Sequence, residues 1–107
     1  ASGTWFVWRE DGTLFEDMAH ARGVPHGPWR IYHPNGRVAE EMVWREGLQE
    51  GRQVDWSPAG ARWAEGEFAR SRPVGTWTCF DSELPRVIPA PPKRMTPAQA
   101  CGFVGED

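Results

Sequence analysis

Short aromatic and β-branched runs alternate with polar turns along most of the chain. Residues 29–32 read Trp-Arg-Ile-Tyr, a Pro-Asn-Gly turn follows, and residues 38–44 then alternate between apolar and polar side chains. Such runs favour β-strands, and Asn-Gly favours the tight turn of a β-hairpin because glycine accepts a positive φ. The alternation predicts that Val38, Met42 and Trp44 share one face of the second strand. The stretch therefore predicts one β-hairpin.

The hairpin pattern recurs without a gap every 24 residues. A fixed period of this size indicates a repeat array, in which each unit packs against its neighbours. The recurring glycines also disfavour helix, because glycine destabilises a helix interior. The columns of aligned residues are Gly3, Gly27, Gly51 and Gly75; Trp5, Trp29, Gln53 and Trp77; Trp8, Tyr32, Trp56 and Phe80; Gly12, Gly36 and Gly60; and Gly23, Gly47 and Ser71.

The predicted fold class is all-β, an antiparallel meander of repeated β-hairpins followed by a proline-rich C-terminal tail. Proline cannot donate a hydrogen bond within a central strand, so we expect the tail to run over the surface and cap the array. Thr96 and Pro97 are expected to start one short helix there. A linker to a further domain and a peptide displayed to a partner are the alternatives. The predicted boundaries are an array over residues 1–84, with units 3–26, 27–50 and 51–74 and a half unit 75–84, and a tail over residues 85–107.

These residues carry a family resemblance. Gly-x-Trp-x-x-Tyr-x-x-Asn-Gly over residues 27–36, an acidic residue in the next strand and Gly-x-x-x-Gly over residues 47–51 resemble the MORN repeat. More narrowly, the chain is similar to the bacterial MORN-variant repeats of YwqK-type antitoxin or immunity proteins. The resemblance covers residues 1–84 and departs from the family pattern at Gln53 and Leu84. It implies an all-β array of about three and a half hairpin units that binds another protein, such as a toxin.

Composition narrows the classes of partner. A chain of 107 residues with 39% hydrophobic residues forms one domain with a modest core, and its seven tryptophans supply much of the apolar area. The net charge of −3 argues against nucleic acid and anionic membrane surfaces as partners. Apolar runs are only a few residues long, so we expect no membrane insertion.

The compartment stays open at this stage, with the cytoplasm slightly favoured. The chain begins Ala1-Ser2-Gly3 at a repeat boundary, which indicates a removed leader or tag or, as we favour, a piece cut from a longer protein. Cys79 and Cys101 could pair in an oxidising compartment and hold the tail on the last strand. In the cytosol they would remain thiols.

Both faces of the predicted sheet carry aromatic side chains. Alternation places Trp5, Trp29 and Trp77 on one face, and Trp8 and Trp56 on the other. A single layer would leave much of this apolar area exposed, which is typical of an interaction surface. Burial by sheet twist and by neighbouring repeats is the alternative. The candidate partner-binding residues are Trp5, Trp29, Gln53, Asp55, Trp77, Tyr32, Trp56, Asp17, Glu41 and Glu65.

Two polar features interrupt the aromatic pattern. Gln53 and Asp55 stand in the third unit alone, where they could form a notch for a donor group of the partner, or reflect drift at a solvated position. Asp17, Glu41 and Glu65 form an acidic column, one per unit, that repels itself unless basic groups lie beside it. We expect a structural or solvated role for this column, or steering of a basic partner. The candidate basic neighbours are Arg22, Arg37, Arg45, Arg62 and Arg70.

The sequence shows no arrangement typical of catalysis or metal binding. His20, His26 and His33 occupy different places in the repeat, and no Ser–His–Asp or Cys–His spacing is present. No two acidic residues pair beyond the repeat itself, and the single glycines do not form a phosphate-binding loop. We therefore expect no enzyme activity, no catalytic residue, no cofactor and no metal site.

The leading hypothesis is a protein–protein binding module. The resemblance implies an antitoxin or immunity protein that occludes its partner. The second hypothesis is a structural or self-associating segment of a larger protein, with a homodimer as one form. The third is carbohydrate or cell-wall binding, because tryptophan faces also stack on sugar rings.

Overall fold

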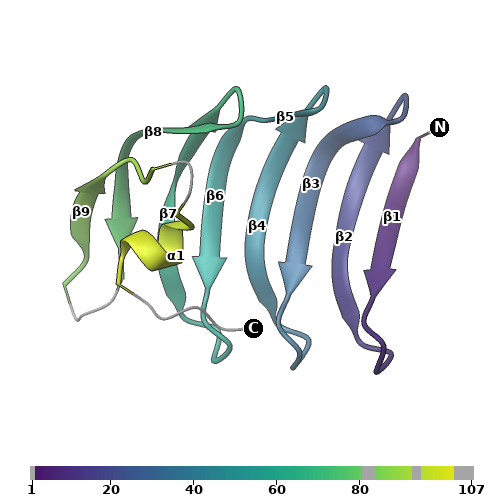
Figure 1. Ribbon diagram of the computed structural model, residues 1–107, viewed down its shortest axis with the longest axis horizontal. Helices are drawn as coiled ribbons and strands as arrows, with labels where there is room; N and C mark the ends of the chain where they lie inside the picture. Colours follow the sequence, from purple (N-terminus) through teal and green to yellow (C-terminus); the bar gives the residue numbers. More distant parts are fainter. Residues whose placement is uncertain (1, 81–83, 93–94, 103–107) are drawn as a thin grey trace.

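The computed structural model describes residues 2–80, 84–92 and 95–102, and it confirms the all-β fold (Figure 1). Within these residues, nine strands form one antiparallel sheet in the order β1-β2-β3-β4-β6-β7-β8-β9, with β5 paired to β4. Strands that follow one another in sequence lie side by side, so the chain is a meander of hairpins. The strands are β1 (Gly3–Trp8), β2 (Leu14–Ala21), β3 (Val24–Tyr32), β4 (Val38–Arg45), β5 (Leu48–Gln49), β6 (Gly51–Trp56), β7 (Arg62–Ala69), β8 (Arg72–Cys79) and β9 (Arg86–Pro89).

Two kinds of turn recur with the repeat. Within the first unit, the amide of Gly12 donates to the carbonyl of Arg9 over 3.0 Å, and Gly12 has a φ of +91°. Between units, both central residues of a two-residue turn have positive φ, as at Arg22 (+57°) and Gly23 (+83°). Such turns match the twist of the strands they join, which explains why glycine recurs at these places.

The third turn between units departs from the glycine column for a local reason. Ser71 has a φ of +66°, a conformation that side chains other than glycine rarely adopt. Its hydroxyl accepts a hydrogen bond from the backbone amide of Gln49 over 3.0 Å. One unit earlier, the residue equivalent to Gln49 is Pro25, which has no amide hydrogen to satisfy. The hydrogen bond from Gln49 therefore offsets the backbone strain at Ser71, and the turn one unit earlier has no amide hydrogen that needs such an acceptor.

A β-bulge recurs in each hairpin and corrects one prediction. Ile31 pairs with Glu40 and Tyr32 pairs with Val38, so the intervening Ala39 is an extra residue on β4. The extra residue places Val38 on the face of Tyr32, opposite to Met42. The prediction that Val38 shares a face with Met42 and Trp44 is therefore wrong, because a bulge interrupts the two-residue period. The equivalent extra residues in the other two hairpins are Phe15 and Trp63.

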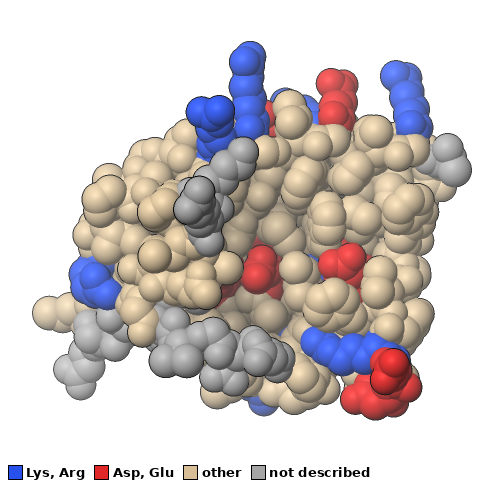
Figure 2. All heavy atoms as spheres, in the orientation of Figure 1, with Lys and Arg blue, Asp and Glu red and all other residues tan. Residues whose placement is uncertain are grey.

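The pairing register assigns side chains to two faces. We call the face on which α1 (Pro97–Ala100) lies the helix face, and the opposite one the open face. Figure 2 shows that the middle of the helix face carries acidic side chains, whereas most of the Lys and Arg side chains visible in this view lie along the turn ends. The helix face includes Trp5, Val7, Glu16, Met18, His20, Trp29, Ile31, Glu40, Met42, Trp44, Gln53, Asp55, Ala64, Trp77 and Cys79; the open face includes Phe6, Trp8, Asp17, Arg30, Tyr32, Glu41, Val54, Trp56, Glu65 and Thr78.

The most deeply buried part of the molecule lies at the β7–β8 end. Ala64, Trp77, Cys79 and Cys101 have no exposed surface. A disulfide joins Cys79 of β8 to Cys101, with their Cα atoms 5.5 Å apart. The guanidinium of Arg86 donates to the carbonyl of Cys101 over 2.8 Å. These contacts fix the end of the described chain on the helix face.

The predicted short helix is present as one helical turn. Thr96 is its N-cap, and its hydroxyl accepts a hydrogen bond from the amide of Gln99 over 3.1 Å. The Gln99 side chain in turn accepts from the Thr96 amide, which completes a capping box. Pro97 occupies the first helical position, as predicted. Among the described residues, no helix is long and apolar enough to cross a membrane.

β9 extends the sheet beyond the boundary predicted at residue 84. It pairs with β8, with Thr76 opposite Pro89 and Cys79 opposite Arg86. Proline is tolerated here because β9 is an edge strand, and an edge strand has no neighbour on one side that needs its amide hydrogens. The proline-rich segment therefore contributes a strand as well as a helical turn.

Candidate functional site

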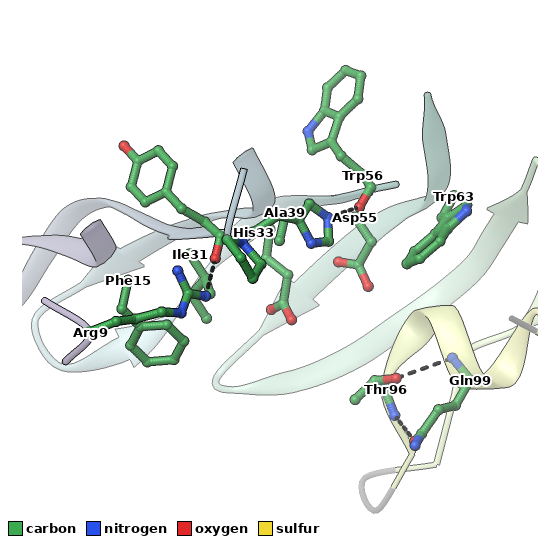
Figure 3. A pocket seen from close by; sticks show the side chains of 13 residues that line it. Arg9, Phe15, Ile31, His33, Ala39, Asp55, Trp56, Trp63, Thr96 and Gln99 are labelled. Carbon is green, nitrogen blue, oxygen red and sulfur yellow. Dashed lines mark hydrogen bonds between the residues drawn. The ribbon is translucent and has the colours of Figure 1, made fainter. Parts of the chain in front are cut away.

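The candidate site is a cavity of about 360 Å³ on the helix face (Figure 3). It lies beside the turns within the hairpins, and it is also lined by Gln99 of α1 and by Thr96, the N-cap of that helix. Bulge residues shape it: Phe15 and Trp63 are large, and Ala39 between them in the repeat is small. The hollow therefore forms where the middle hairpin carries the smallest of the three equivalent side chains.

Successive units are tied together at the cavity by equivalent side chains. The guanidinium of Arg9 donates to the carbonyl of Tyr32 over 2.7 Å, and His33 lies 24 residues later. The Nε2 of His33 lies 2.8 Å from the carbonyl of Trp56. A carbonyl only accepts, so His33 donates from Nε2. Figure 3 shows both contacts, with the Trp56 indole pointing away from the side on which His33 lies.

Two carboxylates meet at this cavity. Glu40 of β4 lies directly opposite Asp55 of β6 in the register, and both residues line the cavity. The Asp55 carboxylate accepts a hydrogen bond from the Gln53 amide over 2.8 Å. The oxygen of Gln53 accepts in turn from the Gln49 amide over 2.5 Å. A chain of buried side-chain amides therefore fixes Asp55 beside Glu40.

Glu40 is the unusual member of this pair. Burial and, to a smaller extent, the nearby Asp55 raise its pKa to about 7, while His33 opposes the change. No described side chain donates a hydrogen bond to its carboxylate. The equivalent carboxylate one unit earlier, Glu16, accepts from the indole of Trp29 over 3.2 Å. Glu40 would need an indole at position 53 for the same contact, and that residue is glutamine.

Packing in the next hairpin explains why residue 53 is not tryptophan. Gln53 lies opposite Gly66, whereas Trp29 lies opposite Met42. A Cβ atom on Gly66 would lie 2.0 Å from the ring of Trp77, so the buried indole of β8 fills the space above this glycine. We infer that a tryptophan at residue 53 would compete with Trp77 for that space. The departure at Gln53 thus has a structural cause, and it leaves Glu40 without a side-chain donor among the described residues.

The structure distributes the ten predicted partner-binding residues over both faces. Asp55, Tyr32 and Trp56 line the cavity. Gln53 and Asp55 are each only 3% exposed, so the predicted polar notch is a buried chain of hydrogen bonds that opens at the cavity. Trp77 has no exposed surface, and Trp5 is 57% exposed at the other end of the sheet. The cavity therefore does not gather the aromatic column.

The acidic column is hydrogen-bonded on the open face. Asp17 accepts from the hydroxyl of Tyr32 over 2.5 Å and from the guanidinium of Arg30 over 3.3 Å. Burial lowers the pKa of Arg30, but the hydrogen bond to Asp17 and the charge of that carboxylate outweigh it, so the pKa is raised overall. Glu41 accepts from the indole of Trp56 over 2.9 Å. Each of these acids therefore receives a donor from the strand that follows it in the sheet.

The third acid of the column is satisfied by arginines. Glu65 pairs with Arg52 and, over 2.7 Å, with Arg62. Of the five arginines expected near the column, Arg62 is the one for which the described residues show such a contact, and Arg30 and Arg52 were not anticipated. These contacts relieve the repulsion that an isolated acidic column would have.

Sequence reasoning missed the residues that make the cavity distinctive. Arg9, His33, Glu40 and Trp63 were not candidates, and the statement that no two acidic residues pair is wrong for Glu40 and Asp55. A usable signal was present in the repeat. Glu40 shares a column with Glu16, whose expected donor follows 13 residues later, and that donor is missing in the next unit.

Comparison with known protein families, curated proteins and solved structures finds no match for this chain. Within the part of the chain that the structure describes, no group of three or more His, Cys, Asp or Glu is placed to hold a metal ion. The geometry itself therefore has to indicate the chemistry. A cavity with two adjacent carboxylates, one of which receives no hydrogen bond from a described side chain, attracts a cation or a strong hydrogen-bond donor.

Proposed function

We propose that the chain is a protein-binding module that receives a basic side chain of its partner in the cavity beside Glu40. The observation that supports this proposal is the Glu40 carboxylate, which is mostly buried and receives no hydrogen bond from a described side chain. An ionised carboxylate in this setting lacks compensation for its lost hydration. A cation bound beside the carboxylate would supply that compensation.

The geometry favours a guanidinium or ammonium group. Residues directly opposite each other in an antiparallel pair have Cβ atoms about 4.5–5.5 Å apart, so Glu40 and Asp55 can contact one cationic group together. Arginine offers several donors in a planar fork, which suits two neighbouring carboxylates. The acidic middle of the helix face in Figure 2 would attract such a side chain before contact.

The state of Glu40 gives the proposal a pH dependence. With a pKa of about 7 in the free protein, the side chain is protonated at pH 5 and ionised at pH 8. A bound cation stabilises the ionised form and lowers this pKa, so binding releases a proton at neutral pH. Affinity for a cationic probe should therefore rise from pH 5 to pH 8.

The test is a titration of the isotope-labelled chain with Nα-acetyl-arginine amide, followed by NMR. We expect saturable shifts around Glu40, His33 and Trp63 at pH 8, weaker at pH 5. Nα-acetyl-citrulline amide, which has the same shape without the charge, should give none. Glu40→Gln should abolish the shifts, whereas Glu16→Gln, which removes the equivalent carboxylate that Trp29 already satisfies, should keep them. Equal binding by wild type and Glu40→Gln would refute the proposal.

A narrower proposal is that this partner is a toxin and the chain its antitoxin or immunity protein. The spacing of the repeat, which resembles MORN-variant immunity proteins, supports it. The basic side chain entering the cavity would then belong to the occluded surface of the toxin. In a host that expresses the toxin, wild type should restore growth and Glu40→Gln should restore less, at equal protein levels. Equal rescue by both would place the toxin elsewhere on the molecule.

Carbohydrate binding is a second candidate, favoured by one observation. Aromatic Phe15 and Trp63 border a cavity that contains two carboxylates, and sugar sites combine such groups. Against it, the guanidinium of Arg9 already lies 5.0 Å from the centre of the Phe15 ring. Titration with neutral oligosaccharides separates the two candidates. Shifts at the cavity that are insensitive to both salt and Glu40→Gln would favour sugar over a basic side chain.

A further inference from the structure

β1 carries the longest consecutive run of exposed large apolar side chains among the described residues. Trp5, Phe6, Val7 and Trp8 are consecutive and are 57%, 55%, 41% and 61% exposed. β1 pairs only with β2 in the sheet, so the backbone groups on its other side have no strand partner among the described residues. β1 also carries none of the charges or prolines that usually protect an edge. The opposite edge, β9, carries both Arg86 and Pro89.

The interior of the array shows what lies against a strand of this type. β3 is equivalent to β1 by the repeat, and its outer neighbour is β2. The indole of Trp29 donates to Glu16 over 3.2 Å on the helix face. On the open face, the hydroxyl of Tyr32 donates to Asp17 over 2.5 Å. Two adjacent carboxylates, one on each face, thus receive two aromatic donors from the neighbouring strand.

The next junction repeats part of this arrangement. β6 is again equivalent to β1, and β4 lies against it with Glu40 and Glu41 at the corresponding positions. The indole of Trp56 donates to Glu41 over 2.9 Å on the open face. On the helix face the aromatic donor is replaced by Gln53. The open-face contact therefore recurs at both junctions. The helix-face contact is present at the β2–β3 junction; at the β7–β8 junction, Ala64 stands at the position of the carboxylate, and the Trp77 indole has no hydrogen-bond partner among the described residues.

β1 carries both aromatic donors, but among the described residues no acidic strand lies on its outer side, and the acids of β2 lie on its inner side. Trp5 aligns with Trp29, and Trp8 aligns with Tyr32 and Trp56. No described side chain accepts a hydrogen bond from either indole of β1. The donors of this edge are therefore arranged for carboxylates that the described part of the chain does not supply.

We infer that the β1 edge binds an extended acidic segment of another protein by strand addition. Transfer of the β2–β3 register predicts its sequence: an acid opposite Val7, a second acid opposite Phe6 and an apolar residue opposite Trp5. The segment runs antiparallel to β1, its first acid accepts from the Trp5 indole and its second from the Trp8 indole. Main-chain hydrogen bonds supply affinity and the two carboxylates supply specificity, as in other forms of strand addition.

A second copy of the chain does not meet this requirement through its described strands. The two strands at the edges, β1 and β9, contain no acidic residue, and the strands with paired acids, β2 and β4, have neighbours on both sides. The inference rests on the proposed protein-binding function, but it concerns a surface at the end of the sheet that is separate from the Glu40 cavity.

The probe for the test is the acetylated and amidated octapeptide with the β2 sequence, Leu-Phe-Glu-Asp-Met-Ala-His-Ala. The comparison peptide replaces Glu-Asp with Gln-Asn. We expect saturable binding of the acidic peptide to the intact chain, with a blue shift of tryptophan fluorescence and slowed hydrogen exchange in β1. Because hydrogen bonds to charged groups are the stronger ones, the Gln-Asn peptide should bind about tenfold or more weakly.

Protein variants locate the binding site. Trp5→Phe/Trp8→Phe keeps the rings but removes both donors, so it should bind the two peptides equally. Glu40→Gln should bind the acidic peptide as wild type does, which separates a failure of this inference from a failure of the cavity proposal. Equal affinity of wild type for both peptides would overturn the inference. So would protection of β1 by a second copy, seen as a dimer in light scattering that the peptide does not dissociate.

Discussion

β1 and β8 are built on the same repeat position, yet one is open to solvent and the other is buried. Trp5 and Val7 of β1 align with Trp77 and Cys79 of β8. The first two side chains are 57% and 41% exposed, and the last two have no exposed surface. Equivalent strand patterns therefore do not fix burial in a single-layer sheet.

What differs between the two ends is the set of contacts outside the strands. At the β8 end, Gly66 leaves space for the Trp77 indole, and Cys101 reaches back to Cys79. At the β1 end, the ring of Trp5 lies over His20 with the ring centres 3.5 Å apart, and its outer side remains exposed. A thin sheet gains a core only where a neighbouring segment covers it. This contrast predicts which substitutions are costly.

The largest expected effect is that of Gly66→Ala. The added Cβ would lie 2.0 Å from the buried ring of Trp77, so the indole cannot keep its position. We expect a loss of about 4 kcal/mol in the free energy of unfolding, at the upper end of overpacking costs. Urea unfolding measures it. In a Trp77→Leu background the same change should cost far less, and equal costs in both backgrounds would show that Trp77 is not the cause.

Removal of the disulfide comes next. Cys79→Ala/Cys101→Ala frees a loop with a sequence separation of 22, and this should lower the free energy of unfolding by about 3 kcal/mol. Reductant should lower the stability of the wild-type chain by a similar amount and leave the double variant unchanged. Two alkylatable thiols in the folded, non-reduced wild type would contradict the expectation.

Glu40→Gln tests the region between the two ends. Because folding raises the pKa of Glu40 from 4.5 to about 7, the folded chain binds its proton more tightly than the unfolded chain does. Stability linked to this group is complete below about pH 4.5 and is lost as the pH rises through 7. The variant should therefore be more stable than wild type by about 2 kcal/mol at pH 8 and similar at pH 4.5. A constant difference across this range would argue against a raised pKa.

The strands and turns were predictable from the sequence because their signals are local. Asn35-Gly36 predicts a turn and the alternation after it predicts a strand, and the same signals recur in each repeat unit. The bulges were not predictable, because the three extra residues have no common residue type. They are Phe15, Ala39 and Trp63. β9 was missed because its prolines argue against a central strand but not against an edge.

The candidate site was only partly predictable, for a different reason. Asp55 was identified because it interrupts the repeat, and such an interruption can be seen in the sequence alone. The state of Glu40 depends on whether residue 53 of β6 can donate to it, and that residue is Gln53 because Trp77 occupies the space above Gly66. These contacts involve β4, β6, β7 and β8. No pattern within a single repeat unit predicts them.

His20→Phe sharpens the comparison at the exposed end. His20 is 6% exposed beneath Trp5, and neither ring nitrogen has a hydrogen-bond partner among the described residues. The equivalent residues in the next two units are Trp44 and Phe68, so an aromatic ring fits this position. Removing two unsatisfied polar atoms should stabilise the chain by about 1 kcal/mol. A loss of stability in thermal unfolding would indicate that a histidine nitrogen has a partner in solution.

Phe6→Thr should have the smallest effect, and it tests the contrast directly. Phe6 is 55% exposed on an edge strand, and the equivalent residue of β8 is Thr78, so threonine suits the backbone of this position. Surface substitutions of this kind usually change stability by less than about 0.5 kcal/mol. A loss well above that value in urea unfolding, growing with protein concentration, would mean that a second copy covers β1 in solution. The two ends of the sheet would then both be covered, one by its own chain and the other by association. A small loss that is independent of concentration leaves the β1 edge free for an acidic strand.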